Sequence, residues 1–315
     1  MPLLQKNINL SDLSNYKIGG PASYFLEVKN LDDLKNGLSE FYKEFSKETH
    51  PRIFIMGAGT NVLIGDKGFP GLVIKDSISE IKFLDQSKVY SGSGNLFEEL
   101  LDFCIENSLS GLEWAGGLPG TVGGAIRGNA GAFKGETKDS TFSVKSIDLK
   151  TFETFDRTNK ECQFGYRTSI FKTDGKEEMI LGAVFEFTKG QKEEIEKETQ
   201  EKIDYRRARH PLEYPNIGST FKNIPLEKVP PEVVKEFSQS IKDDPFPILP
   251  SAKLLAVAGL KGTRSGDAQI SEKHPNFIVN LGNASSEDVL ALIKIAKNAI
   301  KKKYGIELEE EIYYL

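Results

Sequence analysis

The chain has 315 residues, a length at which one hydrophobic core usually stops growing, so two or three domains are expected. With 38% hydrophobic and 28% charged residues, its composition is ordinary for a soluble globular protein. The formal net charge of −5 gives no sign of the basic excess that a nucleic-acid-binding face would normally leave.

The first residues carry no targeting signal. Residues 1–12 lack the basic stretch and the long apolar core of a signal peptide. No window of the chain approaches the roughly 18 consecutive apolar residues that a membrane-spanning helix needs. The sequence therefore predicts a cytoplasmic protein with no membrane partner.

Strand and helix signals alternate at the start of the chain. Residues 24–28 predict a strand, 32–45 an amphipathic helix and Ile53–Met56 a second strand. Short apolar runs follow at 72–74 and 89–91. This order indicates a βαβ-like opening.

The middle of the chain predicts a mixed α+β region. Residues 96–106 predict a helix whose apolar stripe includes Cys104, which is expected to be buried. Strands are predicted at 144–149 and 179–187. The strongly charged stretch 191–209 has only a narrow apolar stripe, so an exposed connecting helix is expected there.

The composition changes in the last third of the chain. Prolines punctuate residues 211–250, so regular structure there must be short. A strand is predicted at 276–280. A helix is predicted to start near Ser285, which has capping-box spacing to Asp288. A last strand is predicted at 306–313.

Metal chemistry is not expected. The two cysteines do not form a CxxC motif, and no two of the three histidines have a spacing typical of zinc ligands.

A first glycine-rich segment, residues 56–63, follows the strand Ile53–Met56. Successive backbone N–H groups in such a turn can form a nest for a pyrophosphate. The third glycine of a dinucleotide-binding fingerprint is missing, so a Rossmann site is not expected. A different phosphate-binding loop and a tight turn between strands both remain open.

A second segment, residues 116–132, contains seven glycines among seventeen residues. Ordering an extended backbone with so few side chains costs much conformational entropy. A flexible loop is the alternative, but Leu118, Val122 and Ile126 indicate burial. The segment is therefore predicted to pack against something flat or bulky, such as an isoalloxazine ring or its diphosphate.

A third segment, residues 215–223, places the hydroxyl of Ser219 beside Gly218 and three residues before Lys222. This arrangement suits delivery of a proton to a bound anion. Taken alone, however, an ordinary Gly-Ser turn is favoured.

These segments occur in the same order as motifs of the UDP-N-acetylenolpyruvoylglucosamine reductases, which the chain resembles from about residue 15 to its end. The Leu-Glu-Tyr-Pro version of the third segment resembles the second structural type of that family. The matching motifs are Ile18-Gly19-Gly20, Gly57-Ala58-Gly59-Thr60-Asn61, Gly111-Leu112-Glu113, Gly117-Leu118-Pro119-Gly120-Thr121-Val122-Gly123-Gly124, Asn129-Ala130-Gly131-Ala132, Tyr166-Arg167-Thr168-Ser169-Ile170-Phe171, Leu212-Glu213-Tyr214-Pro215, Gly218-Ser219-Thr220-Phe221-Lys222-Asn223, Gly259-Leu260-Lys261-Gly262, Ser271-Glu272-Lys273-His274 and Gly305-Ile306-Glu307-Leu308-Glu309-Glu310-Glu311-Ile312.

The resemblance implies an α+β fold with an FAD-binding region of the vanillyl-alcohol-oxidase (PCMH) type. Its two subdomains are expected at 1–75 and 76–205, and an α+β substrate-binding domain with the C-terminal catalytic strand at 206–315. The implied enzyme is a monomer in which NADPH reduces FAD and the flavin reduces UDP-N-acetylenolpyruvoylglucosamine to UDP-N-acetylmuramate, a peptidoglycan precursor.

The resemblance also implies site residues. Arg167 would bind the enolpyruvyl carboxylate bidentately, Ser219 would donate the proton, and Glu311 would lie near the enol. The implied cofactor-binding residues are Gly57, Ala58, Gly59, Thr60, Asn61, Gly117, Leu118, Pro119, Gly120, Gly123, Gly124, Asn129, Ala130, Gly131 and Arg167. The implied substrate-binding residues are Arg209, Lys222 and Asn223, with Arg209 standing where a lysine is usual.

Two alternatives remain at this point. One is another flavin oxidoreductase of the same fold, acting on a hydroxyl or an aldehyde. The other is a non-catalytic module that binds a nucleotide sugar or a flavin.

Overall fold

A computed structural model of the chain describes residues 3–45, 51–173 and 177–315. The chain forms two compact units. Unit 1 comprises residues 1–8, 22–58 and 70–204, and unit 2 comprises 9–21, 59–69 and 205–315. Two N-terminal segments, 9–21 and 59–69, thus belong to the same unit as the C-terminal third.

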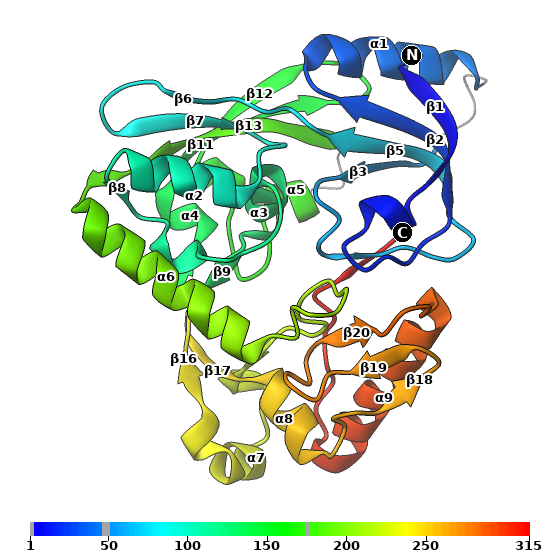
Figure 1. Ribbon diagram of the computed structural model, residues 1–315, viewed down its shortest axis with the longest axis vertical. Coiled ribbons are helices and arrows are strands. Elements are labelled where there is room, and N and C mark those ends of the chain that lie inside the picture. Colours follow the sequence, from blue (N-terminus) through cyan, green and yellow to red (C-terminus); the bar gives the residue numbers. More distant parts are fainter. Residues whose placement is uncertain (1–2, 46–50, 174–176) are drawn as a thin grey trace. The chain divides into compact units, whose positions relative to one another are not determined.

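The first sheet of unit 1 has four strands covered by one helix. Its strand order is β1 (Leu4–Asn9), β2 (Pro21–Val28), β5 (Phe69–Asp76) and β3 (Ile53–Met56). Helix α1 (Leu31–Lys43) lies across one face of this sheet (Figure 1). Leu34, Leu38 and Phe41 of α1 pack against Leu26 and Ile74 of the sheet, which buries the predicted amphipathic stripe.

The second sheet of unit 1 is antiparallel, in the order β12 (Thr154–Thr158), β11 (Thr141–Asp148), β13 (Glu178–Glu186), β7 (Lys88–Gly92) and β6 (Ile81–Phe83). Helices α2 (Phe97–Glu106) and α3 (Val122–Gly128) share one apolar core with it. Cys104 is buried in this core, as predicted.

The remaining elements of unit 1 are short, apart from a long charged helix. They are the strand pairs β8 (Leu109–Ser110) with β14 (Thr188–Lys189) and β9 (Gly131–Ala132) with β10 (Gly135–Glu136), and helices α4 (Thr137–Ser140), α5 (Ile170–Thr173) and α6 (Lys192–Arg209). The last turn of α6 belongs to unit 2. Most of α6 is exposed, as its charged sequence predicts.

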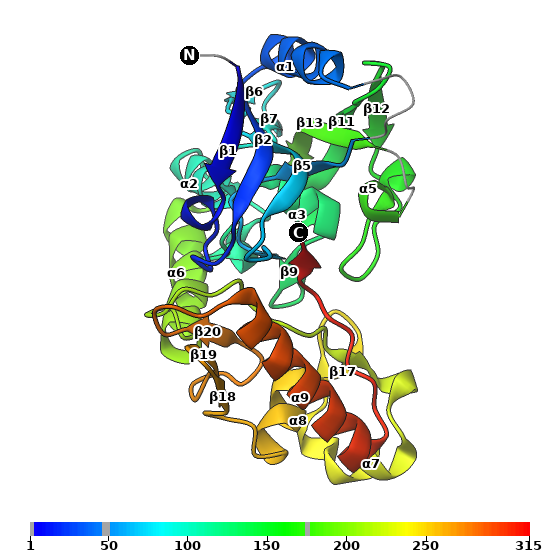
Figure 2. The ribbon, with the colours of Figure 1, turned by 90° about the vertical axis from the view of Figure 1, so that its right-hand side faces the viewer.

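Unit 2 is organised around its longest helix, α9 (Ser286–Tyr304), which begins at the predicted capping box of Ser285 and Asp288. Figure 2 shows the terminal segment, in red, running back from the end of α9 to β21. The other elements are α7 (Pro231–Glu236), α8 (Ser251–Val257), the sheet β15 (Ile224–Pro225), β17 (Pro247–Leu249) and β16 (Lys242–Asp243), and the sheet β18 (Arg264–Ser265), β19 (Ala268–Ile270) and β20 (Ile278–Asn280).

The N-terminal segments of unit 2 are part of its core. Tyr16 and Leu63 are buried among the apolar side chains that line α9, and the Tyr16 hydroxyl donates a 2.9 Å hydrogen bond to the Ile278 carbonyl. Strand β21 (Tyr313–Tyr314) pairs in parallel with β4 (Val62–Leu63). The end of the chain is therefore fixed to a segment near its beginning.

The structure corrects sequence predictions at two glycine-rich or terminal segments. Part of the glycine-rich segment 116–132 is the helix α3 instead of extended chain, because Thr121 caps it: its hydroxyl accepts from the Gly124 N–H at 3.3 Å. The strand predicted at 306–313 is reduced to a single bridge at Glu310 and to β21, because the pairing with the segment around Phe221 extends over one bridge and the pairing with β4 begins at Tyr313. Within the described ranges, no helix is long and apolar enough to cross a membrane.

Candidate active site

The first two glycine-rich segments meet within unit 1. A Cβ atom on Gly57 would overlap the hydroxyl of Thr121, so only glycine fits at the first position of the loop. The Gly57 carbonyl accepts a 2.5 Å hydrogen bond from the ammonium group of Lys75, which is half-buried on β5. Burial lowers the pKa of Lys75. The loop thus packs closely against Thr121 and is held by the hydrogen bond from Lys75.

Helix α3 presents two neighbouring glycines in different surroundings. A Cβ atom on Gly123 would lie 3.0 Å from the Ser93 Cβ and 3.4 Å from an Asp76 carboxylate oxygen, so close packing requires glycine there. Gly124 is exposed, and a Cβ atom on it would touch only the Thr121 hydroxyl, at 3.5 Å, among the described residues. Protein packing therefore explains Gly123 but not Gly124.

Arg167 lies against the third predicted cofactor motif. Its guanidinium donates a 2.8 Å hydrogen bond to the Gly131 carbonyl, and its φ of 55° places the backbone in the left-handed region. Asn129 is fully buried and also left-handed. Its amide donates to the Gly165 carbonyl at 2.9 Å and to Glu136 at 3.1 Å, and its oxygen accepts from the Lys138 N–H. The Asn129 side chain therefore holds the loop of Arg167 in place.

Unit 2 brings two of the three predicted catalytic residues together. Ser219 follows Gly218, whose φ of 81° and N–H bond to the Asn216 side chain, at 3.0 Å, form a tight turn. The next residue, Thr220, accepts a 2.8 Å hydrogen bond from the N–H of Glu311. The segments that carry Ser219 and Glu311 are thus hydrogen-bonded neighbours, with an antiparallel bridge at Phe221 and Glu310.

The terminal segment is also held by a residue that the sequence assigned to the cofactor. The Asn61 amide donates to the Glu311 carbonyl at 3.2 Å, and the Asn61 carbonyl accepts from the Tyr313 N–H at 3.0 Å. Gly59, Thr60 and Asn61 lie in unit 2, whereas Gly57 and Ala58 lie in unit 1. Asn61 fixes the backbone on both sides of Ile312.

The predicted substrate-binding residues have different environments. The Lys222 ammonium lies 3.3 Å from Glu309, and the Asn223 side-chain oxygen accepts a 3.3 Å hydrogen bond from the Ser251 N–H. Arg209 is exposed at the end of α6, with its guanidinium 5.1 Å from the ring centroid of Tyr205.

Two histidines that the sequence left unassigned are in contact in unit 2. The ring centroids of His210 and His274 are 5.3 Å apart, and both rings pack against Phe277. Burial lowers the pKa of His210 to about 3 and that of His274 to about 4. Both are therefore neutral at pH 7, and both rings pack against Phe277.

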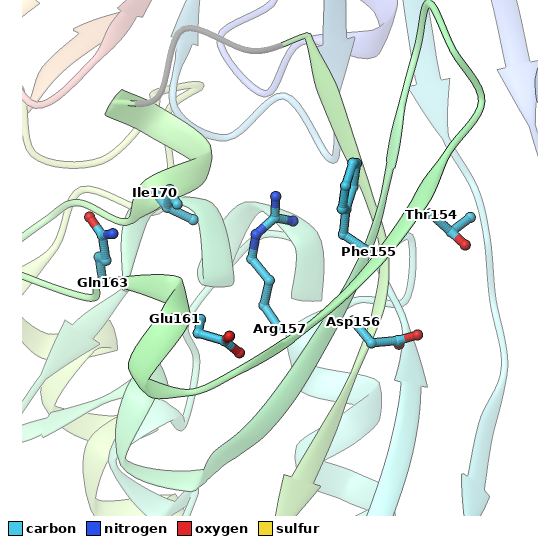
Figure 3. Close-up of a pocket in the computed structure, with 7 residues that line it drawn as sticks. All are labelled: Thr154, Phe155, Asp156, Arg157, Glu161, Gln163 and Ile170. Atoms are coloured by element: carbon cyan, nitrogen blue, oxygen red, sulfur yellow. The ribbon is translucent and has the colours of Figure 1, made fainter.

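A pocket of about 530 Å³ opens beside β12 and α5 in unit 1 (Figure 3). Among its charged residues, Arg157 forms a bidentate ion pair with the buried side chain of Glu178, at 2.8 Å for both bonds. No sequence-predicted site residue lines this pocket; its lining is Thr154, Phe155, Asp156, Arg157, Glu161, Gln163 and Ile170.

Sequence reasoning missed two polar residues that hold the predicted loops. Lys75 could have been noticed as a lysine next to the apolar run Leu72, Val73 and Ile74. Asn276, whose side chain binds the backbone of Phe221, was assigned to a strand and gave no signal of its own.

Unit 1 fits a bound flavin nucleotide. Gly124 is exposed and free of close packing, Gly57 begins a restrained loop, and Arg167 lies at Gly131. Glycines that protein packing does not require are typical of places where a ligand approaches the backbone closely. In the described ranges, no group of three or more His, Cys, Asp or Glu residues is placed to hold a metal.

Comparison with known proteins identifies both parts of the chain. A family model described as an FAD binding domain matches residues 23–151, and one described as the UDP-N-acetylenolpyruvoylglucosamine reductase C-terminal domain matches 210–315. The reductase of Fervidobacterium nodosum is 38% identical over 97% of this chain and 90% of its own length, and that of Clostridium novyi 33% over 98% and 91%.

A solved structure agrees with the sequence comparisons. The crystal structure of UDP-N-acetylenolpyruvylglucosamine reductase from Thermus caldophilus matches with a TM-score of 0.76 and 28% identity, and covers 99% of both chains. The predicted fold, a PCMH-type FAD-binding region followed by a further α+β domain, is confirmed.

Proposed function

The chain belongs to the UDP-N-acetylenolpyruvoylglucosamine reductase family and is a flavin-dependent oxidoreductase that uses FAD, and from this we propose that it reduces UDP-N-acetylenolpyruvoylglucosamine to UDP-N-acetylmuramate with NADPH. The near-complete coverage of the relatives supports the assignment of the whole reaction to this chain. The product would serve peptidoglycan synthesis in the cytoplasm, and the enzyme would act as a monomer.

The residues proposed to hold FAD in unit 1 are the loop at Gly57 and Ala58, the segment from Gly117 to Gly120, Gly123 and Gly124, and the segment from Asn129 to Gly131. When bound, FAD supplies the hydride that passes from NADPH to the enolpyruvyl group. The protein must bind and orient the acceptor and handle the proton and charge that the reduction creates.

Arg167 is proposed to bind the enolpyruvyl carboxylate. Addition of hydride to the terminal alkene carbon leaves negative charge on the adjacent carbon and its carboxylate. A guanidinium can form two parallel hydrogen bonds to a carboxylate, so it both orients the group and stabilises the added charge. The 2.8 Å bond from the Arg167 guanidinium to the Gly131 carbonyl holds the fork against the proposed cofactor segment, which supports this role.

Ser219 is proposed to protonate the adjacent carbon, and Glu311 to act beside it. The observation that carries this pairing is the 2.8 Å hydrogen bond from the Glu311 N–H to the Thr220 carbonyl, which places the two residues on neighbouring segments.

Arg209, Lys222 and Asn223 are proposed to bind the nucleotide sugar. Two of them are cations, which suits the diphosphate of the substrate. Lys222 would exchange its contact with Glu309 for the substrate, since that exposed pair at 3.3 Å contributes little to stability.

The test separates the two half-reactions. Anaerobic stopped-flow absorbance of the flavin would follow its reduction by NADPH and its reoxidation by UDP-N-acetylenolpyruvoylglucosamine. Ser219→Ala should leave reduction near the parent rate and slow reoxidation by about a hundredfold to ten-thousandfold, the usual effect of losing a general acid. If both half-reactions slow equally, Ser219 organises the flavin pocket instead; if neither slows, another group donates the proton.

A further inference from the structure

We propose that Asn276 is a positioning residue of this reaction, which fixes Ser219 relative to Glu311 by binding the backbone of Phe221. The inference rests on the proposed role of Ser219 as proton donor. Asn276 belongs to none of the predicted motifs and lies 55 residues from Phe221 along the chain.

The Asn276 side chain binds both the N–H and the carbonyl of Phe221, as the backbone of a neighbouring strand would. The Phe221 N–H donates to the Asn276 side-chain oxygen at 3.0 Å, and the Asn276 amide donates to the Phe221 carbonyl at 2.8 Å. The Asn276 carbonyl also accepts from the Thr220 N–H at 2.7 Å. Three hydrogen bonds from one residue therefore hold the two residues that follow Ser219.

The opposite edge of the same segment binds the terminal segment. The Thr220 carbonyl accepts from the Glu311 N–H at 2.8 Å, and the Lys222 N–H donates to the Glu309 carbonyl at 2.9 Å. Backbone groups of an extended segment alternate between its two edges. Asn276 therefore occupies the edge that the terminal segment leaves open, and the segment after Ser219 is fixed from both sides.

The chemistry of this contact requires an asparagine. Asn276 is only 3% exposed, so backbone groups of Phe221 that lost their partner would remain buried without a hydrogen bond. A short side-chain amide offers one acceptor and one donor at the spacing of a peptide group. Aspartate keeps the acceptor but replaces the donor by a second acceptor facing the Phe221 carbonyl.

The expected effect is specific to one half-reaction. Ser219 is adjacent to the held segment, so loosening Phe221 would displace the serine hydroxyl. A misplacement of about 1 Å in a reacting group can cost about a hundredfold in rate. Reduction by NADPH does not use Ser219, so it should be unaffected.

The chain contains a matched control in Asn280. It is 1% exposed and uses its side chain in the same way: its amide donates to the Tyr16 carbonyl at 3.1 Å, and its oxygen accepts from the Gly282 and Ala284 N–H groups at 2.8 and 3.0 Å. Its backbone N–H donates to the Pro215 carbonyl at 2.9 Å, but its side-chain hydrogen bonds go to Tyr16, Gly282 and Ala284 and not to the residues that follow Ser219. A merely structural role of Asn276 would give the same kinetic result for both residues.

The experiment measures both half-reactions in flavin-loaded Asn276→Asp, Asn276→Ser and Asn280→Asp proteins. We expect reoxidation by UDP-N-acetylenolpyruvoylglucosamine to slow about a hundredfold in the Asn276 variants while reduction stays within about twofold of the parent. In Asn280→Asp, the ratio of the two rates should be unchanged. Asn276→Ser removes the side-chain amide without adding a charge, so it provides the test if the aspartate variant does not fold.

A double variant separates this proposal from the one on which it rests. If Asn276 acts only through Ser219, adding Asn276→Ser to Ser219→Ala should not slow reoxidation further. The positioning role would be overturned if the double variant slowed reoxidation by the product of the two single effects. It would also be overturned if Asn276→Ser slowed both half-reactions equally. Parent-like reoxidation in Ser219→Ala would instead remove the proposed proton donor.

Discussion

Gly124 gives a sharp test of the cofactor site because its substitution should have opposite effects on folding and on FAD binding. Gly124 lies in α3, and an added Cβ atom would meet only the Thr121 hydroxyl, at 3.5 Å, among the described residues. Alanine in a helix is favoured over glycine by about 0.5–1 kcal/mol. The flavin-free Gly124→Ala protein should therefore be as stable as the parent or slightly more stable.

FAD binding should weaken in the same variant if the cofactor packs against Gly124. Forcing a methyl group into closely packed space costs about 1–3 kcal/mol, which corresponds to a Kd roughly five- to 150-fold higher. Gly128, at the other end of α3, also has open space around its Cβ position but is not among the residues proposed to hold FAD, so it is the matched control. Gly128→Ala should leave the Kd unchanged.

The assay combines thermal unfolding of the flavin-free proteins with FAD titration followed by quenching of flavin fluorescence. A parent-like Kd in Gly124→Ala would show that FAD does not approach this glycine. Marked destabilisation of the flavin-free variant would show that Gly124 is required for packing after all, contrary to the space around it.

Three further predictions follow from the contacts of unit 1 and unit 2. Arg167→Lys should retain flavin but slow reoxidation by the substrate, because a point charge cannot replace a bidentate fork; equal turnover would remove Arg167 from its role. Lys75→Met should raise the Kd for FAD several-fold, because the Gly57 carbonyl loses its 2.5 Å hydrogen-bond partner. Lys145→Met, at an exposed lysine, should leave the Kd unchanged, and the FAD titration described above measures both. The buried histidines bind protons less readily than the unfolded chain, so the free energy of unfolding should fall as the pH drops from about 6.5 toward 4, by up to about 1.4 kcal/mol per pH unit for each. In a His210→Gln/His274→Gln protein, the free energy of unfolding, measured by denaturant titration at each pH, should depend less steeply on pH across this range. An unchanged pH dependence would contradict the lowered pKa values of the two histidines.

Most of the regular structure could be predicted because local chemistry determines it. The strand Ile53–Met56 and the capping box of Ser285 and Asp288 lie where the sequence predicts them. The helix α3 was missed because glycines hid its apolar period, and its cap at Thr121 is a single residue. The strand predicted at 276–280 begins only at Ile278, because Asn276 turns its side chain to the backbone of Phe221.

The candidate site was predicted through its motifs, and its supporting contacts could not be. Ser219 and Glu311 were named from the order of motifs, but their adjacency depends on a hydrogen bond between Thr220 and Glu311. Asn61 was assigned to the cofactor, yet its side chain binds the carbonyl of Glu311. Such partners lie far apart in the sequence, so neither periodicity nor spacing reveals them.

The pairing of β21 with β4 has a consequence for biosynthesis. Asn61 and Glu311 are 250 residues apart, and Gly65 and Leu315 are joined by a further backbone hydrogen bond of 2.8 Å. During translation, segments 9–21 and 59–69 emerge from the ribosome long before their partners do. Unit 2 can therefore close only after residues 311–315 have left the ribosome, and its early segments are the ones that a chaperone would have to shield in the meantime.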